Sequence, residues 1–266
     1  MSEISRRNLF RAAGVLGASA AIPAELRAEA RQSRPSPAAR QQAHPKPAAR
    51  APYRFFNTLE AAFIEAAVDR LIPPDSQWTG AVGAGVPGYI DLQLAGAYGQ
   101  GARLYRSGPW DTGLPSQGYQ LALTPAQLYR TAIASLDRQL KQHVSSGAKN
   151  APAFARLSSD DQDGVLRDLE AGKMDLSGIP SAVFFETLLA NTIEGFFSDP
   201  MYGGNRDMVG WRMIGFPGAY ATYLGIYTNH GERFTREPMS IAQSPQEHHP
   251  MPGGLPPFDS GVQRRG

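Results

Sequence analysis

Residues 196–218 read FFSDPMYGGNRDMVGWRMIGFPG, and this stretch decides how the chain is organised. It overlaps the end of a strongly apolar run, Ser181 to Phe197, that has the composition of a buried helix. Asp, Asn, Pro and Gly then crowd together, which is typical of turns, and Gly203 and Gly204 permit backbone angles that other residues avoid. The pattern predicts a buried helix that ends in a non-helical, exposed loop held in one shape.

This loop is the strongest candidate for a functional surface. Trp, Tyr and Arg carry much of the binding energy at protein interfaces. A rigid loop can present Arg206 and Tyr202 outward while Trp211 anchors it from beneath. The structural alternative, which can hold at the same time, is a helix-terminating turn in which Asp199 and Asn205 bond to local backbone. The predicted partner-docking residues are Asp199, Tyr202, Gly203, Gly204, Asn205, Arg206 and Trp211.

Helical periodicity recurs along the chain. Asn57 and Glu60 have the spacing of a capping box. Thr124 and Pro125 supply an N-cap and a first-turn proline, and Ser158 with Asp161 caps a shorter helix. The predicted helices run from Asn57 to Ile72, Tyr89 to Tyr98, Pro125 to Val144, Ser158 to Gly172 and Ser181 to Phe197.

These patterns predict a mainly α fold. No segment alternates apolar and polar residues for long, so strands should be few or absent. We expect an irregular helical domain at residues 55–231, with long ordered loops such as 99–123, and buried side chains for Leu136 and Leu140. Residues 232–266 are rich in proline and should form an extended or disordered tail.

The N-terminus indicates export. Arg6 and Arg7 precede a short, weakly apolar run, so residues 1–30 resemble a twin-arginine signal peptide. Residues 31–54 are a Pro/Ala/Arg linker that cannot fold alone. From Tyr53 onward the chain has 17 basic and 21 acidic residues, which gives no electrostatic reason to expect a nucleic-acid partner.

Motifs for chemistry of the chain's own are weak. There is no cysteine, which excludes thiolate catalysis, disulfides and covalent c-type haem attachment. Residues 83–88 match the spacing of a dinucleotide-binding loop, but neither flank fits that motif. His248 and His249 lie in the proline-rich tail without a second ligand cluster, and Asp160, Asp161 and Asp163 suit helix capping better than acid/base catalysis. We therefore expect no catalytic, cofactor-binding or metal-binding residue.

Several separate motifs, in order, resemble the gluconate 2-dehydrogenase subunit 3 family, the small subunit of membrane-bound flavin-dependent sugar and sugar-acid dehydrogenases. The similar stretches run from about Leu59 to Gly218: residues 69–73 with Asp75, 80–81, 89–91, 199–205, 210–211 and 216–218.

The resemblance implies a non-catalytic subunit. It would escort a FAD-dependent partner of the glucose-methanol-choline (GMC) type through the twin-arginine translocase and stabilise it in the periplasm. FAD would belong to the partner, and a membrane-anchored cytochrome subunit with haem c could complete the complex. The N-terminal linker and C-terminal tail depart from the family pattern.

Two other functions remain open at this point. The first is a free-standing periplasmic protein that binds a small molecule in the irregular region of residues 99–123. The second is an independent enzyme. An adjacent gene for a flavoprotein without its own signal peptide would favour the accessory subunit.

Overall fold

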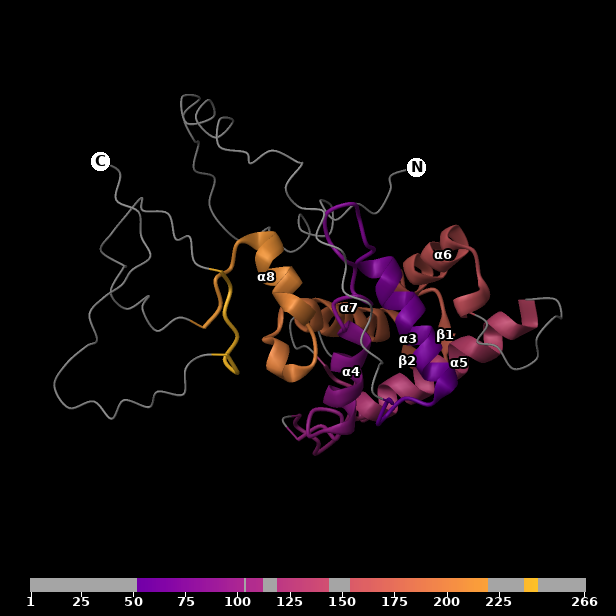
Figure 1. Ribbon diagram of the computed structural model, residues 1–266. Coiled ribbons are helices and arrows are strands. Elements are labelled where there is room, and N and C mark those ends of the chain that lie inside the picture. The colour runs from indigo at the N-terminus through magenta and orange to yellow at the C-terminus, as the bar shows by residue number, and fades with distance from the viewer. Residues whose placement is uncertain (1–51, 103, 112–118, 144–153, 220–236, 244–266) are drawn as a thin grey trace, which may run out of the picture. The chain divides into compact units, whose positions relative to one another are not determined.

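The computed structural model describes residues 52–102, 104–111, 119–143, 154–219 and 237–243. The chain divides into two units, residues 1–52 and 53–266, and the elements below belong to the second. Its α-helices are α3 (Thr58–Leu71), α4 (Val86–Ala95), α5 (Pro125–His143), α6 (Ser159–Glu170), α7 (Ser181–Phe197) and α8 (Val209–Ile214). Helices dominate the described residues (Figure 1), so the predicted mainly α fold is confirmed.

Short elements join these helices. In the described residues, the single turns of 3-10 helix are η3 (Phe154–Arg156), η4 (Pro200–Tyr202) and η5 (Arg206–Met208). One small hairpin pairs β1 (Asp175–Leu176) with β2 (Ile179–Pro180) in antiparallel register. Its two turn residues, Ser177 and Gly178, both have positive φ, as a tight hairpin turn requires.

Side-chain caps fix the helix starts where the sequence predicts them. The Asn57 side chain accepts a hydrogen bond from the Glu60 N–H at 2.9 Å, and the Glu60 carboxylate accepts one from the Asn57 N–H at 3.0 Å. Thr124 and Gln127 form the same reciprocal pair before α5, at 2.9 and 3.2 Å. Ser158 caps α6 by accepting the Asp161 N–H. The three predicted caps are confirmed.

Helix α7 lies at the centre of the helical domain. It contacts α3, α4, α5, α6 and α8, and in Figure 1 it passes behind α3 and α4. Its Phe184 is fully buried, with ring centroids 5.6 Å from Tyr129 and 6.2 Å from Phe63. Leu136 and Leu140 of α5 are buried in the same core, as predicted.

Helix α4 differs from its prediction. It begins at Val86 instead of Tyr89, because Gly85 takes the left-handed conformation at the N-cap and Pro87 is tolerated in the first turn. It also ends at Ala95, before the predicted end at Tyr98. The glycine-rich run therefore forms both the turn and the start of the helix.

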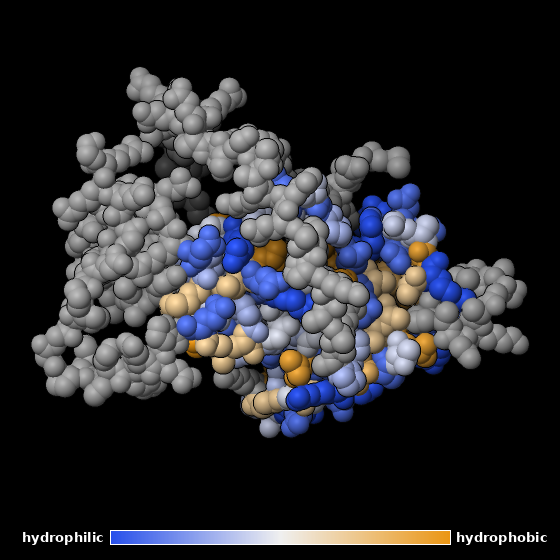
Figure 2. Space-filling view, viewed as in Figure 1, coloured by the Kyte–Doolittle hydropathy of each residue, from blue (hydrophilic) through white to orange (hydrophobic). Residues whose placement is uncertain are grey.

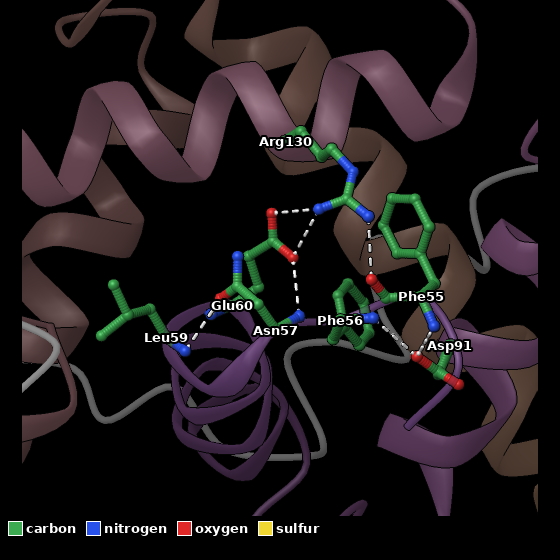
Figure 3. A network of polar contacts seen from close by, with 7 residues as sticks. All are labelled: Phe55, Phe56, Asn57, Leu59, Glu60, Asp91 and Arg130. Atoms are coloured by element: carbon green, nitrogen blue, oxygen red, sulfur yellow. Dashed lines mark hydrogen bonds and ion pairs between the residues drawn. The ribbon is translucent and has the colours of Figure 1, made fainter. Parts of the chain in front are cut away.

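Residues 54–56 are fastened by the buried carboxylate of Asp91 on α4. That carboxylate accepts the backbone N–H groups of Arg54, Phe55 and Phe56 at 2.7, 2.9 and 2.9 Å. Figure 3 shows the bonds from Phe55 and Phe56. Asp91 is only 2% exposed. Three converging N–H groups are enough to hold a carboxylate away from water.

Arg130 of α5 completes this arrangement. One guanidinium nitrogen donates to both Glu60 oxygens at 3.0 Å, and the other donates to the Phe55 carbonyl at 2.9 Å (Figure 3). The guanidinium also stands 4.1 Å from the centre of the Phe55 ring. Asp91, Glu60 and Arg130 are called the domain-start network below. Each comes from a different helix, so the network requires α3, α4 and α5 to be assembled.

A second ion pair joins helices that are far apart in sequence. Arg70 of α3 donates to both oxygens of Asp163 on α6, at 2.7 and 2.9 Å. This fork-to-carboxylate geometry orients both side chains. Asp163 therefore joins α6 to α3 and is not limited to the helix-capping role that the sequence suggested.

Candidate docking surface

The predicted docking loop is the structure that caps the end of α7. Asn205 donates its backbone N–H to the Gly195 carbonyl at 2.9 Å and its side-chain amide to the Ser198 carbonyl at 2.8 Å. Its side-chain oxygen accepts the Gly210 N–H at 2.8 Å. Asn205 has no exposed surface. It thus satisfies backbone groups that the helix end would leave unpaired.

Glycine is required where the loop lies against α7. A side chain at Gly204 would place its first carbon 2.1 Å from the Gly195 carbonyl oxygen. At Gly210 the corresponding contact, with the Phe196 carbonyl oxygen, would be 2.2 Å. Either substitution would push the loop off the helix.

The loop backbone is strained as well as close-packed. Asn205, Asp207 and Met208 all have positive φ, with values of 44°, 57° and 54°. Such angles are costly for residues other than glycine and persist only where surrounding contacts fix them. The loop is therefore held in one shape, but η4, η5 and α8 lie within residues 196–218. The expectation of a wholly non-helical segment is wrong.

Trp211 is buried at 6% exposure and anchors the chain after the loop. Its indole N–H donates to the Phe197 carbonyl at 2.7 Å. Its ring meets Phe216 edge to face, with centroids 5.2 Å apart. The side chain therefore joins the end of α7 to α8.

Asp199 is also buried, and it holds two separate segments. One carboxylate oxygen accepts the Met201 N–H at 3.0 Å, and the other accepts the Ile241 N–H at 2.7 Å. Met239 pairs with residues 217–219 through two further backbone bonds. Of the predicted tail, residues 237–243 are described, and they lie against the loop.

The exposed part of the loop is formed by the remaining predicted docking residues. Tyr202 is 49% exposed, and Gly203 and Arg206 are also exposed. Arg206 donates its backbone N–H to the Ala84 carbonyl, but its guanidinium forms no ion pair with any described residue. The structure thus divides the seven residues into a buried set that shapes the loop, Asp199, Gly204, Asn205 and Trp211, and an outward set.

The described part of residues 99–123, the predicted small-molecule region, borders an open groove of about 980 Å³. Trp110 and Tyr119 line one wall, and the outer face of α7 with Glu194 lines the other. Burial raises the pKa of the Glu194 carboxyl. Burial also raises the pKa of Tyr119 to about 12, so its phenol stays neutral at physiological pH.

The weaker candidate motifs find little support. Residues 83–88 lead into α4, and no strand precedes them among residues 52–82, so they lack the setting of a dinucleotide-binding loop. The described residues contain no group of three or more His, Asp or Glu side chains placed to hold a metal ion. Arg6, Arg7, His248 and His249 lie outside the described residues.

None of the helices in the described residues combines the length and the hydropathy that crossing a bilayer needs.

Other residues that resemble the family pattern, Asp75, Gly80 and Ala81, hold the turn after α3. The Asp75 carboxylate accepts the N–H groups of Gln77 and Trp78 at 2.8 and 2.7 Å. Ala81 donates to the Ile72 carbonyl, and a side chain at Gly80 would stand 2.5 Å from the same oxygen. The sequence did not reveal the part that Asp91 takes in the domain-start network, because its three donors are backbone groups 35 to 37 residues away.

Comparison with protein families agrees with these motifs. The model of the family described as gluconate 2-dehydrogenase subunit 3 matches residues 58–218, more than half of the chain. The match spans α3 to α8 and includes both the domain-start network on its helices and the docking loop. No curated protein and no solved structure matches. The chain belongs to the gluconate 2-dehydrogenase subunit 3 family and is an accessory subunit of a dehydrogenase complex.

Proposed function

We propose that this chain is the cofactor-free small subunit of a periplasmic, FAD-dependent dehydrogenase of the GMC type that oxidises a sugar, sugar acid or alcohol. It binds the folded flavoprotein, accompanies it through the twin-arginine translocase and stabilises it after export. A membrane-anchored cytochrome with haem c would attach the complex to the membrane. Family membership supports the assignment to a dehydrogenase complex.

One observation carries the docking role: a loop of fixed shape leaves a guanidinium and a phenol outward. Asn205 and the glycines hold the backbone, so little conformational entropy is lost when a partner binds. Arg206 forms no ion pair with a described residue, and its planar fork can bind a carboxylate through two parallel bonds. Tyr202 adds aromatic contact area beside it.

Escort has a physical reason. A flavoprotein must bind FAD where the cofactor is made, so it folds before it crosses the membrane. An export signal is then best carried by a second chain that binds only the folded form. Because binding to the folded state shifts the unfolding equilibrium, the same contact also stabilises the flavoprotein.

The decisive experiment is purification of the tagged full-length chain from its native host. We expect a flavoprotein to co-purify and to give a flavin absorption spectrum. The chain expressed alone should carry neither flavin nor haem and should oxidise no sugar. A chain that is always recovered alone, or one with a chromophore of its own, would contradict the proposal.

Export is tested separately through the twin arginines. Replacing Arg6 and Arg7 by lysine should leave both this chain and its flavoprotein in the cytoplasm. A second variant keeps the signal intact and carries Arg206→Ala. This chain should still be exported, but the amount of flavoprotein in the periplasm should fall. If the flavoprotein reaches the periplasm in the lysine variant, it has its own route and the escort role is wrong.

A second candidate function rests on the groove beside residues 99–123. Its volume of about 980 Å³ and its Trp110 and Tyr119 lining suit a small organic ligand. In that case the free protein should bind a periplasmic metabolite and show a higher melting temperature with it. Thermal-shift screening of the protein purified alone separates this function from the accessory role.

A further inference from the structure

A smaller groove of about 620 Å³ lies beside the docking loop. It runs between α4 and the turns that follow it, and the loop closes one side. Aromatic and small apolar residues predominate in its lining, among them Tyr89, Leu92, Ala97, Tyr98, Ala102 and Tyr202. Tyr202 thus belongs to both the groove and the docking loop.

The lining is suited to an apolar guest. None of the described residues that line the groove is charged. Leu92, Tyr98 and Tyr202 are 39%, 38% and 49% exposed, and all three line this one groove. Burial, helped by nearby Glu194, raises the pKa of Tyr89 to about 12, so this phenol also stays neutral. A partner side chain that covers these groups would remove apolar surface from water.

The groove is held in shape from three sides. Gly203 has a φ of 94°, and a side chain there would come within 2.9 Å of the Leu92 methyl carbon. Tyr98 donates its hydroxyl to Asn191 of α7 at 3.2 Å. A side chain at Gly195 would stand 2.8 Å from the Tyr89 ring, so that ring lies directly on α7. The groove therefore exists before any partner binds.

Arg206 lies next to the same surface. A side chain at Gly85, just before α4, would lie 3.1 Å from the Gly203 carbonyl oxygen and 3.5 Å from a guanidinium nitrogen of Arg206. A side chain at Gly203 would in turn reach Leu92. An uncharged groove and an outward cation are thus neighbours on one rigid surface.

On the face shown in Figure 2, hydrophobic residues occur in small separate groups between hydrophilic ones, without one large apolar patch. A docking contact on such a surface depends on a few well-placed side chains instead of a broad apolar area.

We propose that this groove receives an apolar side chain of the dehydrogenase subunit, and that a carboxylate on the same surface of the dehydrogenase pairs with Arg206. The proposal rests on the accessory-subunit function and names the kind of contact through which it is carried out. A central apolar anchor with a charged contact at its edge is a common arrangement of binding energy at interfaces. Arg206 stands at the edge of the groove without an ion pair to a described residue, so a partner that brings a carboxylate complements this surface.

Leu92→Asp tests the groove, and the chain offers a matched control. Leu59 of α3 is 38% exposed, almost the same as Leu92, but it does not line the groove. We expect Leu92→Asp to weaken binding to the co-purifying flavoprotein by at least about tenfold. Leu59→Asp should change it by less than about twofold. An aspartate is favourable in the first turn of α3 and unfavourable in the last turn of α4, so the melting temperature of each free variant is measured first and affinities are compared at a temperature where both are folded.

A second variant fills the groove instead of charging it. Ala97 is exposed and lines the groove, so Ala97→Trp adds volume there without entering the core. It should weaken binding as Leu92→Asp does, because the partner's side chain can no longer enter. Normal binding by both variants would overturn the groove proposal.

The remaining outcomes separate the groove from the function on which it rests. If Arg206→Ala weakens binding while both groove variants bind normally, docking by the loop stands and the groove plays no part. If the wild-type chain binds no flavoprotein, the accessory function itself fails. If the wild-type chain alone forms dimers that Leu92→Asp separates, the groove receives a second copy and the proposal is wrong.

Discussion

Residues 54–57 and residues 198–211 are both held against helices by polar groups, but different groups hold them. In the domain-start network, the charges of Asp91, Glu60 and Arg130 bind backbone and one another. The docking loop is held to α7 by the neutral side chains of Asn205 and Trp211. The first segment thus uses all three charged groups internally, whereas the second uses the Asp199 carboxylate internally and leaves Arg206 outward.

This difference is informative about function. A charge that already has an internal partner must lose it before it can bind anything else, which costs much of the energy gained. Arg206 has no such ion pair with a described residue, and the loop keeps its shape without it. The comparison therefore assigns stability to one segment and binding to the outward face of the other.

The largest expected effect is at Trp211. Trp211→Ala should destabilise the free subunit by about 3 to 5 kcal/mol, because it removes a large buried ring and the bond to the Phe197 carbonyl. Chemical denaturation measures this change directly. A loss below about 0.5 kcal/mol, which is usual at the surface, would show that the loop does not depend on this anchor.

The second-largest loss of stability is expected at Asp91. Asp91→Ala leaves three backbone N–H groups without their acceptor and should cost about 3 kcal/mol. Asp91→Asn keeps one acceptor oxygen and should recover part of that loss. Hydrogen exchange at residues 54–56 locates the effect, since those amides should lose protection first. Equal stability of the alanine variant and the wild type would refute the assigned role.

The salt dependence of the stability lost on replacing Arg130 distinguishes the two segments. Its side chain is 48% exposed, so Arg130→Gln should cost only about 1 kcal/mol, and less at about 0.5 M salt. The cost of Trp211→Ala should not depend on salt. If the two costs respond equally to salt, the contrast between a charged network and a neutral one is wrong.

The smallest effect concerns pH. Burial raises the pKa of Glu194 from its ordinary value of 4.5, so the folded state holds this proton more tightly than the unfolded state does. Unfolding free energy should therefore decline slightly as pH rises from 4.5 through the raised pKa. Glu194→Gln should flatten that decline. If the unfolding free energy of the variant declines more steeply with pH than that of the wild type, the sign expected for Glu194 is wrong.

Signals that act over a few residues could be predicted from the sequence. The caps at Asn57, Thr124 and Ser158 and the span of α7 are such signals, because capping and periodicity are local. The start of α4 was missed because Gly85 serves as a left-handed N-cap, which resembles an ordinary loop glycine in sequence.

Contacts between distant residues could not be predicted. Nothing local shows that Asp91 binds residues 54–56 or that Asp199 binds Ile241, because in each case the donor is a backbone N–H. Burial depends on such distant contacts, so the seven predicted docking residues could not be divided into buried and outward sets from the sequence. Their burial separates Asn205 and Trp211, which shape the loop, from Arg206 and Tyr202, which face outward.

The most direct test of the docking role compares affinity and melting temperature for Arg206→Ala. We expect association with the flavoprotein to weaken about thirtyfold, or ~2 kcal/mol, because a two-pronged contact is lost. The melting temperature of the free subunit should stay nearly unchanged, in contrast to Trp211→Ala, which should lower it and lose binding as a consequence. An Arg206→Ala subunit that binds the flavoprotein with wild-type affinity would contradict the account.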